Sequence, residues 1–192
     1  MVSAAPTPGA RRVLDDADVR TLEDEMRREF PRLRFVAKDG DAFSRLVDVA
    51  LRIATLGGQR FYMTRYVTTI GATIWLPSGW ERRSALDRIA TLRHERVHLR
   101  QFRRFGLVGM SVLYLLPILP IGLAYGRARL EWEAYAETIR AHAELAGPAA
   151  ARSPELRAHV LRQFVSSAYG WMWPFPRTVN RWIDALLDEI AP

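Results

Sequence analysis

The sequence predicts a mostly helical α+β fold in which a small sheet or hairpin precedes a central helix. Several stretches carry apolar residues at spacings of three and four, the period of an amphipathic helix. β-Branched and aromatic residues concentrate between positions 61 and 76, which favours strands. Residues 81–105 contain neither glycine nor proline, so a long helix can run through them. With 192 residues and 49% hydrophobic content, the chain can form one domain with a core.

The first part of the chain is expected to alternate helices with short connections. A helix begins at Asp15 or Asp16, either of which can cap it, and ends near Phe30 because Pro31 stops it. A short strand, a turn and a second helix follow, over residues 33–37, 38–41 and 43–56. The glycine pair at 57–58 ends that second helix.

Two strand-like stretches precede the central helix. Residues 61–70 and 72–76 are separated by Gly71 and closed by Pro77. They predict a hairpin or one long bulged strand.

After the central helix, residues 106–126 carry no charge, and this length alone makes them a candidate membrane span. Pro117 and Pro120 would interrupt a spanning helix, so we expect an apolar helical hairpin instead. Such a hairpin belongs to the core or makes shallow contact with a membrane. The arginines that flank it on both sides give no orientation.

The C-terminal part is expected to contain a linker over residues 147–153, followed by helices over 153–192. Ser153 can cap a helix that ends near Tyr169, and Val179–Ile190 is amphipathic. Between these helices lies an aromatic turn over residues 170–176. The whole chain is therefore predicted to be a disordered lead-in, residues 1–14, and a single domain, residues 15–192.

The central helix contains the motif that carries chemistry, His94-Glu95-Arg96-Val97-His98. Histidines four apart lie on one face of a helix, so both imidazoles can point at a single ion. Glu95 lies at the edge of that face, where it can reach a metal-bound water as a general base. A zinc hydrolase needs neutral nitrogen ligands, a general base and an open coordination position on the metal, and this motif can supply them.

A zinc site needs a third protein ligand, and the predicted helix after the apolar stretch supplies candidates. Glu131 shares a face with few charges, whereas Glu133 lies on a charged stripe. We therefore favour Glu131 as the third ligand and keep Glu133 as the alternative. His142 and His159 are outside candidates.

The combination of His94-Glu95-x-x-His98 with Glu131-Trp-Glu-Ala-Tyr135 resembles the gluzincin pattern of zinc metallopeptidases. It is most similar to the metal motifs of the CAAX-prenyl and heat-shock membrane proteases and of the phage-repressor-cleaving peptidases. The resemblance implies a zincin-like fold, one Zn²⁺ per chain held by His94, His98 and Glu131, and Glu95 as base. Tyr135 departs from the pattern, which has an acid or amide there to orient a ligand histidine. That role is then unfilled or moved to Glu137.

The resemblance further implies a peptide or protein substrate, often paired with a strand edge beside the metal helix. Tyr169 could donate to an oxyanion, as tyrosines do in some zinc peptidases. The rival interpretations are a non-catalytic zinc-binding protein and a peripheral membrane or interaction protein that uses residues 106–126.

The composition and net charge limit the partners, the metal ligands and the cellular location that we expect. The net charge of +7 comes from arginine, with Lys38 the only lysine, and no nucleic-acid-binding signature accompanies it. The absence of cysteine excludes disulfides and thiolate ligands. The N-terminus lacks the apolar region of a secretory signal, so we expect a cytoplasmic protein, with membrane association as an alternative.

Overall fold

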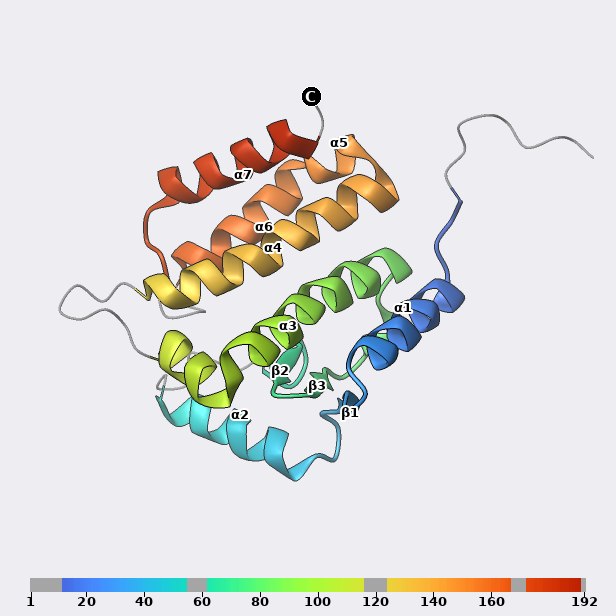
Figure 1. The fold of residues 1–192 in the computed structure, drawn as a ribbon, viewed down its shortest axis with the longest axis vertical. Helices are drawn as coiled ribbons and strands as arrows, with labels where there is room; N and C mark the ends of the chain where they lie inside the picture. The colour runs from blue at the N-terminus through green and yellow to red at the C-terminus, as the bar shows by residue number, and fades with distance from the viewer. Residues whose placement is uncertain (1–11, 55–61, 116–123, 167–171, 191–192) are drawn as a thin grey trace, which may run out of the picture.

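A computed structural model describes residues 12–54, 62–115, 124–166 and 172–190 (Figure 1). The helices and strands follow one another as α1 (Asp16–Glu29), β1 (Arg34–Ala37), α2 (Ala42–Ala54), β2 (Thr68–Ile70), β3 (Thr73–Leu76), a 3-10 turn (Trp80–Arg82), α3 (Ala85–Leu115), α4 (Tyr125–Ala146), α5 (Pro148–Ala151), α6 (Pro154–Val165) and α7 (Pro176–Ile190). The mostly helical α+β prediction, with its small sheet ahead of the central helix, is confirmed.

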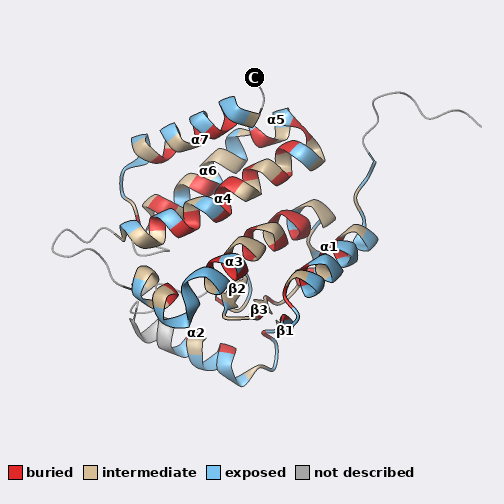
Figure 2. Cartoon of the chain, viewed as in Figure 1, coloured by how far each residue is buried: buried red, intermediate tan, exposed pale blue. Residues whose placement is uncertain are grey.

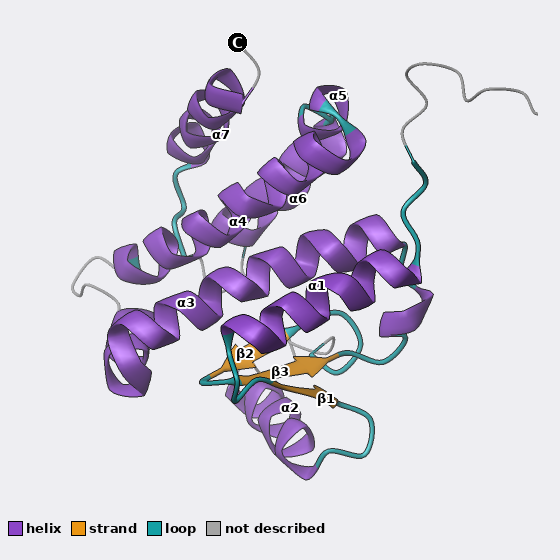
Figure 3. Ribbon diagram, turned by 45° about the vertical axis from the view of Figure 1, so that its right-hand side comes forward, coloured by secondary structure: helices purple, strands orange, loops and turns teal. Residues whose placement is uncertain are grey.

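The three strands form one sheet beside α3, with β3 in the middle and β1 and β2 at the edges (Figure 3). β1 pairs with β3 in parallel, and β2 pairs with β3 antiparallel as a hairpin around Gly71. Gly71 has a φ of 60°, which favours glycine at this turn. The predicted first strand of the hairpin was too long, because residues 62–65 form a turn.

α1 begins where the sequence indicates. The Asp15 side chain accepts from the backbone N–H groups of Ala17 and Asp18, and the Asp18 side chain accepts from the N–H of Asp15. This reciprocal capping satisfies donors that the first turn of a helix leaves free. The lead-in is described only from Arg12, which pairs with Asp18, and residues 1–11 lie outside the described part.

α3 continues past the predicted end of the central helix but is not straight. Gly106 has φ 67° and ψ 175°, a conformation that no helical residue adopts, so the segment after it turns away from the first part of α3. None of the helices in the described part of the chain is both long and apolar enough to cross a membrane. α4 runs back along α3, and residues 116–123 of the predicted hairpin lie outside the described part (Figure 1).

The C-terminal helices follow the prediction with shifted boundaries. Residues 148–151 form the short helix α5 rather than a linker, with Pro148 at its first turn. Ser153 caps α6 as predicted, but α6 ends at Val165, and residues 167–171 are not described. The described part of the aromatic turn is packed, since Trp173 stacks on Trp182 with ring centroids 6.2 Å apart.

Buried apolar residues form two cores, one on each side of the contact between α3 and α4 (Figure 2). The first joins α1, the sheet and the first half of α3; its best-buried members are Met26, Ile74 and Leu92. The second joins α4, α6 and α7; its fully buried members include Val160, Phe164 and Val179. The α3–α4 contact between them therefore positions any group that both helices share.

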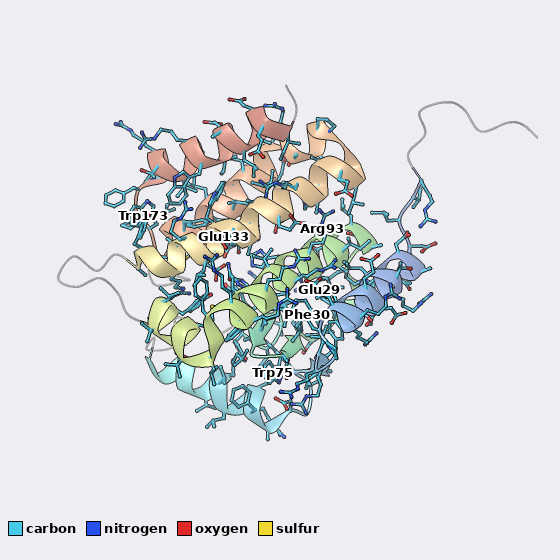
Figure 4. The ribbon with its side chains drawn as sticks, in the orientation of Figure 1. Glu29, Phe30, Trp75, Arg93, Glu133 and Trp173 are labelled. Carbon is cyan, nitrogen blue, oxygen red and sulfur yellow. The ribbon has the colours of Figure 1, made fainter. Side chains whose placement is uncertain are left out.

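Ion pairs line both sides of α3. Arg93 pairs with Glu137 and Glu144 of α4, whereas Arg96 and Arg100 pair with Glu29 of α1. Figure 4 places Arg93 on the α4 side of α3 and Glu29 at the end of α1. The arginines thus attach α3 to both neighbouring helices.

Candidate metal centre

His94 and His98 lie on the face of α3 that meets α4, as their spacing of four residues requires. Each is only 8% exposed. Their Nε2 atoms lie 3.2 Å apart, so both imidazoles point at the same place.

The hydrogen bonds on the far side of each ring determine which nitrogen carries the proton. Thr138 donates its hydroxyl hydrogen to the Ala134 carbonyl, so its oxygen is free to accept from Nδ1 of His94 at 3.2 Å. The Gln101 amide nitrogen donates to Glu133, so its carbonyl oxygen accepts from Nδ1 of His98 at 2.9 Å. With both Nδ1 atoms protonated, both Nε2 atoms present lone pairs. Two lone pairs at this separation repel unless a cation lies between them.

Glu131 of α4 completes the group. It is 3% exposed, and its Oε2 lies 3.8 Å from Nε2 of His94 and 3.8 Å from Nε2 of His98. The point equidistant from these three atoms lies about 2.1 Å from each, within the range of zinc–nitrogen and zinc–oxygen bonds. His94, His98 and Glu131 could therefore hold a metal ion.

The charges of the group favour a bound cation. Burial lowers the pKa of His94 well below its usual value, and the neighbouring His98 lowers it further, which keeps His94 neutral. Burial alone would lower the pKa of His98, but the carboxylates of Glu131 and Glu95 raise it overall. The same carboxylates would attract a metal ion in place of a proton.

Glu95 lies beside this group and is supported from the sheet. The hydroxyl of Thr69, in edge strand β2, donates to Oε2 of Glu95 at 2.7 Å. Glu95 is 6% exposed, and burial raises the pKa of its carboxyl group. A carboxylate with a raised pKa is better matched to taking a proton near neutral pH.

The other candidates from the sequence lie elsewhere. Glu133 is exposed, and its contact is with the Gln101 amide rather than with the histidine nitrogens. Glu137 pairs with Arg93, so it does not orient a ligand histidine as suggested above. His142 contacts the Thr138 carbonyl, and His159 lies against the ring of Tyr135; neither belongs to the metal-binding group. Tyr169 lies outside the described residues.

Four supporting residues were not identified from the sequence: Thr69, Gln101, Tyr114 and Thr138. Tyr114, after the break at Gly106, donates its hydroxyl to Oε1 of Glu131. Tyr135, at the position that departs from the gluzincin pattern, packs edge-on against His94 with centroids 4.6 Å apart. Gln101 and Thr138 had a sequence signal, since Gln101 shares the helical face of the two histidines and Thr138 shares that of Glu131.

Comparison with protein-family models, with curated proteins and with solved structures finds no match to this chain.

Proposed function

We propose that this chain is a zinc-dependent metallopeptidase with a zincin-like site. The observation that carries the proposal is the convergence of two Nε2 lone pairs and a buried carboxylate on one point, with Glu95 beside them. Imidazole and carboxylate ligands suit zinc, and three protein ligands leave a position open for chemistry. The residues present therefore fit the ion, and one Zn²⁺ per chain is expected.

When bound, zinc supplies Lewis acidity that makes a water molecule a nucleophile and polarises a carbonyl group. Glu95 takes a proton as the water oxygen attacks the peptide carbonyl carbon. The carbon–nitrogen bond then breaks, and Glu95 passes the proton to the leaving amine. Thr69 holds the Glu95 carboxylate during both transfers. β2 is an edge strand of the described sheet, so the backbone of an extended peptide substrate would pair with its outer side.

The test combines elemental analysis with digestion of a peptide library. Wild type should bind one zinc per chain and cleave peptides. Glu95→Gln should keep the zinc but lose about 10²- to 10⁴-fold in turnover, the usual contribution of a general base. His94→Ala should lose both. Zinc binding without cleavage in wild type would indicate a non-catalytic zinc protein, and full turnover of Glu95→Gln would refute the mechanism.

A second candidate function, contact with a membrane surface, is favoured by an unusual face of α2. Three of its apolar side chains are exposed, Phe43, Leu46 and Val49 being 43%, 66% and 53% exposed, together with Arg45, while its buried positions include Ser44 and Asp48. An amphipathic helix normally buries its apolar face, so this face suits another apolar phase.

The segment after Gly106 also exposes apolar side chains. Leu107 and Val108 are 59% and 77% exposed, and Arg103 and Arg104 are exposed just before them. Arginines beside an exposed apolar segment suit an anionic bilayer. Wild type should float with vesicles that contain anionic lipid, less so at high salt, and Leu107→Glu with Val108→Glu should abolish flotation. Equal flotation of wild type and the double variant would refute this candidate.

A further inference from the structure

Lys38 is a charged side chain that the site described above does not use. It follows β1 directly, and its backbone N–H donates to the Leu76 carbonyl at the end of β3. Its side chain is fully buried. It is also the only lysine among 28 basic residues, all the others being arginine.

All three N–H groups of the Lys38 ammonium have acceptors. Nζ donates to the carbonyls of Tyr62 and Tyr66 at 2.9 and 2.8 Å and to the Thr68 hydroxyl at 3.0 Å. It also lies 3.5 Å from the centroid of the Tyr62 ring. An ammonium has three donors, so the site satisfies it completely. Every acceptor belongs to residues 62–68, the segment that leads into β2.

That segment leads directly to the proposed general base. Thr68 accepts from Lys38, and the next residue, Thr69, donates to the Glu95 carboxylate. Side chains alternate across a strand, so neighbouring threonines reach opposite sides of β2. Lys38 on one side and Glu95 on the other are therefore joined through two consecutive residues.

We propose that Lys38 is a positioning residue for Glu95, fixing residues 62–68 and, through β2, the Thr69 hydroxyl against that carboxylate. This inference rests on the proposed function, which makes Glu95 the base. The opposite charges of Lys38 and Glu95 attract across β2. Burying an ammonium costs free energy unless the charge is paired. Neutral donors could satisfy the two carbonyls without that cost, so we assign the charge of Lys38 a role towards Glu95.

The charged groups around Lys38 support this role. Burial lowers the pKa of Lys38 to about 7, while Glu95 of α3 and Asp48 of α2 both raise it. Burial likewise raises the pKa of the Tyr62 hydroxyl. The ammonium thus interacts with carboxylates from two helices packed around the sheet.

The first test uses turnover and zinc content together. Lys38→Met keeps the length of the side chain without charge or donors. It should keep one zinc per chain but lose about 100-fold in kcat, as expected for a misplaced catalytic group, with little change in KM. Val36→Ala, in the edge strand β1 that Lys38 follows, is the control: it should weaken the sheet without changing kcat. Full turnover of Lys38→Met with zinc bound would overturn the positioning role and leave the peptidase proposal intact.

Chemical rescue separates the charge from the shape of the side chain. Since the chain lacks cysteine, Lys38→Cys creates a single thiol that can be alkylated in denaturant before refolding. An aminoethyl group restores an ammonium at nearly the original length, whereas a propyl group restores only length. The aminoethyl form should recover turnover and the propyl form should not; equal activity of the two forms would count against the proposal.

A third measurement does not depend on any activity. Lysine labelled with ¹³C at Cε gives one signal, because Lys38 is the only lysine. Its titration midpoint should lie near 7 in wild type and lower in Glu95→Gln, which lacks the opposing charge. An unchanged midpoint in Glu95→Gln would show that the two groups do not interact and would overturn the proposal. A shifted midpoint in a protein without peptidase activity would leave Lys38 linked to Glu95 and refute only the function.

Discussion

If the chain holds zinc as proposed, removing the Glu131 carboxylate should remove nearly all of the stability that bound zinc gives, whereas removing the Glu133 carboxylate should leave a measurable part of it. Glu131 supplies the only negative charge in the group that could hold the metal, at 3.8 Å from each imidazole nitrogen. Glu133 contacts only the Gln101 amide that orients His98. The two carboxylates are two residues apart on α4, so the pair of alanine variants forms a matched comparison.

The expected magnitudes follow from linkage between binding and folding. At a free zinc concentration 1,000 times the wild-type Kd, zinc stabilises the fold by about 4 kcal/mol. In a chain of this size that raises Tm by about 8–16 °C. If Glu131→Ala weakens zinc binding by on the order of 10³-fold, the same free zinc concentration stabilises the folded variant by only about 0.4 kcal/mol. Glu133→Ala loses a contact that orients the ligand His98, and such a loss typically weakens metal binding about 10- to 100-fold. Zinc would then still stabilise the folded variant by roughly 1.4–2.7 kcal/mol.

The assay is thermal unfolding of each protein with buffered free zinc and with a chelator, each variant being compared with its own metal-free form. The Tm increase with zinc should be greatest in wild type, intermediate in Glu133→Ala and smallest in Glu131→Ala. The reverse order for the two variants would show that Glu133 is the ligand. No increase in wild type would show that the three side chains do not hold zinc.

Three further predictions concern stability. Because burial lowers the pKa of Lys38 to about 7, the unfolded chain binds one more proton than the folded chain above that pH. The free energy of unfolding should therefore rise by up to about 1.4 kcal/mol per pH unit between about pH 7.5 and 9.5, and Lys38→Met should lose this rise. Hydrogen bonds from Arg100 and Arg96 lower the pKa of Glu29 to about 2. The contribution of the Glu29 carboxylate to the free energy of unfolding is therefore complete above about pH 4.5 and is lost as the pH falls towards 2. Glu29→Gln should cost about 1–2 kcal/mol at pH 7 and almost nothing near pH 2 in denaturant titrations; an equal loss at both pH values would contradict the ion-pair explanation. Phe164 is fully buried, so Phe164→Ala should cost about 3–5 kcal/mol in the same titration without changing zinc stoichiometry, and a loss under 1 kcal/mol would contradict its place in the core.

The parts of the site that sequence reasoning located depend on local geometry. The spacing of His94 and His98 fixes their common face as soon as a helix forms, and α3 forms because nothing between 85 and 105 interrupts it. Helical phase likewise separated Glu131 from Glu133, since Glu131 lies on the less charged face of α4 and is buried, whereas Glu133 is exposed. Caps such as Asp15 and Ser153 were predictable for the same reason.

The parts that sequence reasoning missed depend on partners distant in the chain. The carboxylate partners of the α3 arginines, Glu29 and Glu137, lie more than 40 positions away in the chain, so the helical pattern of α3 does not identify them. The roles of Thr69 and Thr138 were not predicted, because a hydroxyl supports Glu95 or His94 only once the strand or helix has docked. A helical pattern constrains one face of one element, but it carries no information about which element will meet that face.

The position of the metal-binding group between two cores links its chemistry to the stability of the whole chain. The histidines belong to the helix that packs with α1 and the sheet, whereas Glu131 belongs to the helix that packs with α6 and α7. A cation bound by all three therefore bonds the two layers to each other, in addition to the ion pairs of Arg93. Glu95 is held from the sheet by Thr69, whereas Glu131 lies on α4 in the other layer, so base and ligand come together only when the layers are docked. Conditions that separate the layers should accordingly abolish zinc binding and hydrolysis together, before either core unfolds.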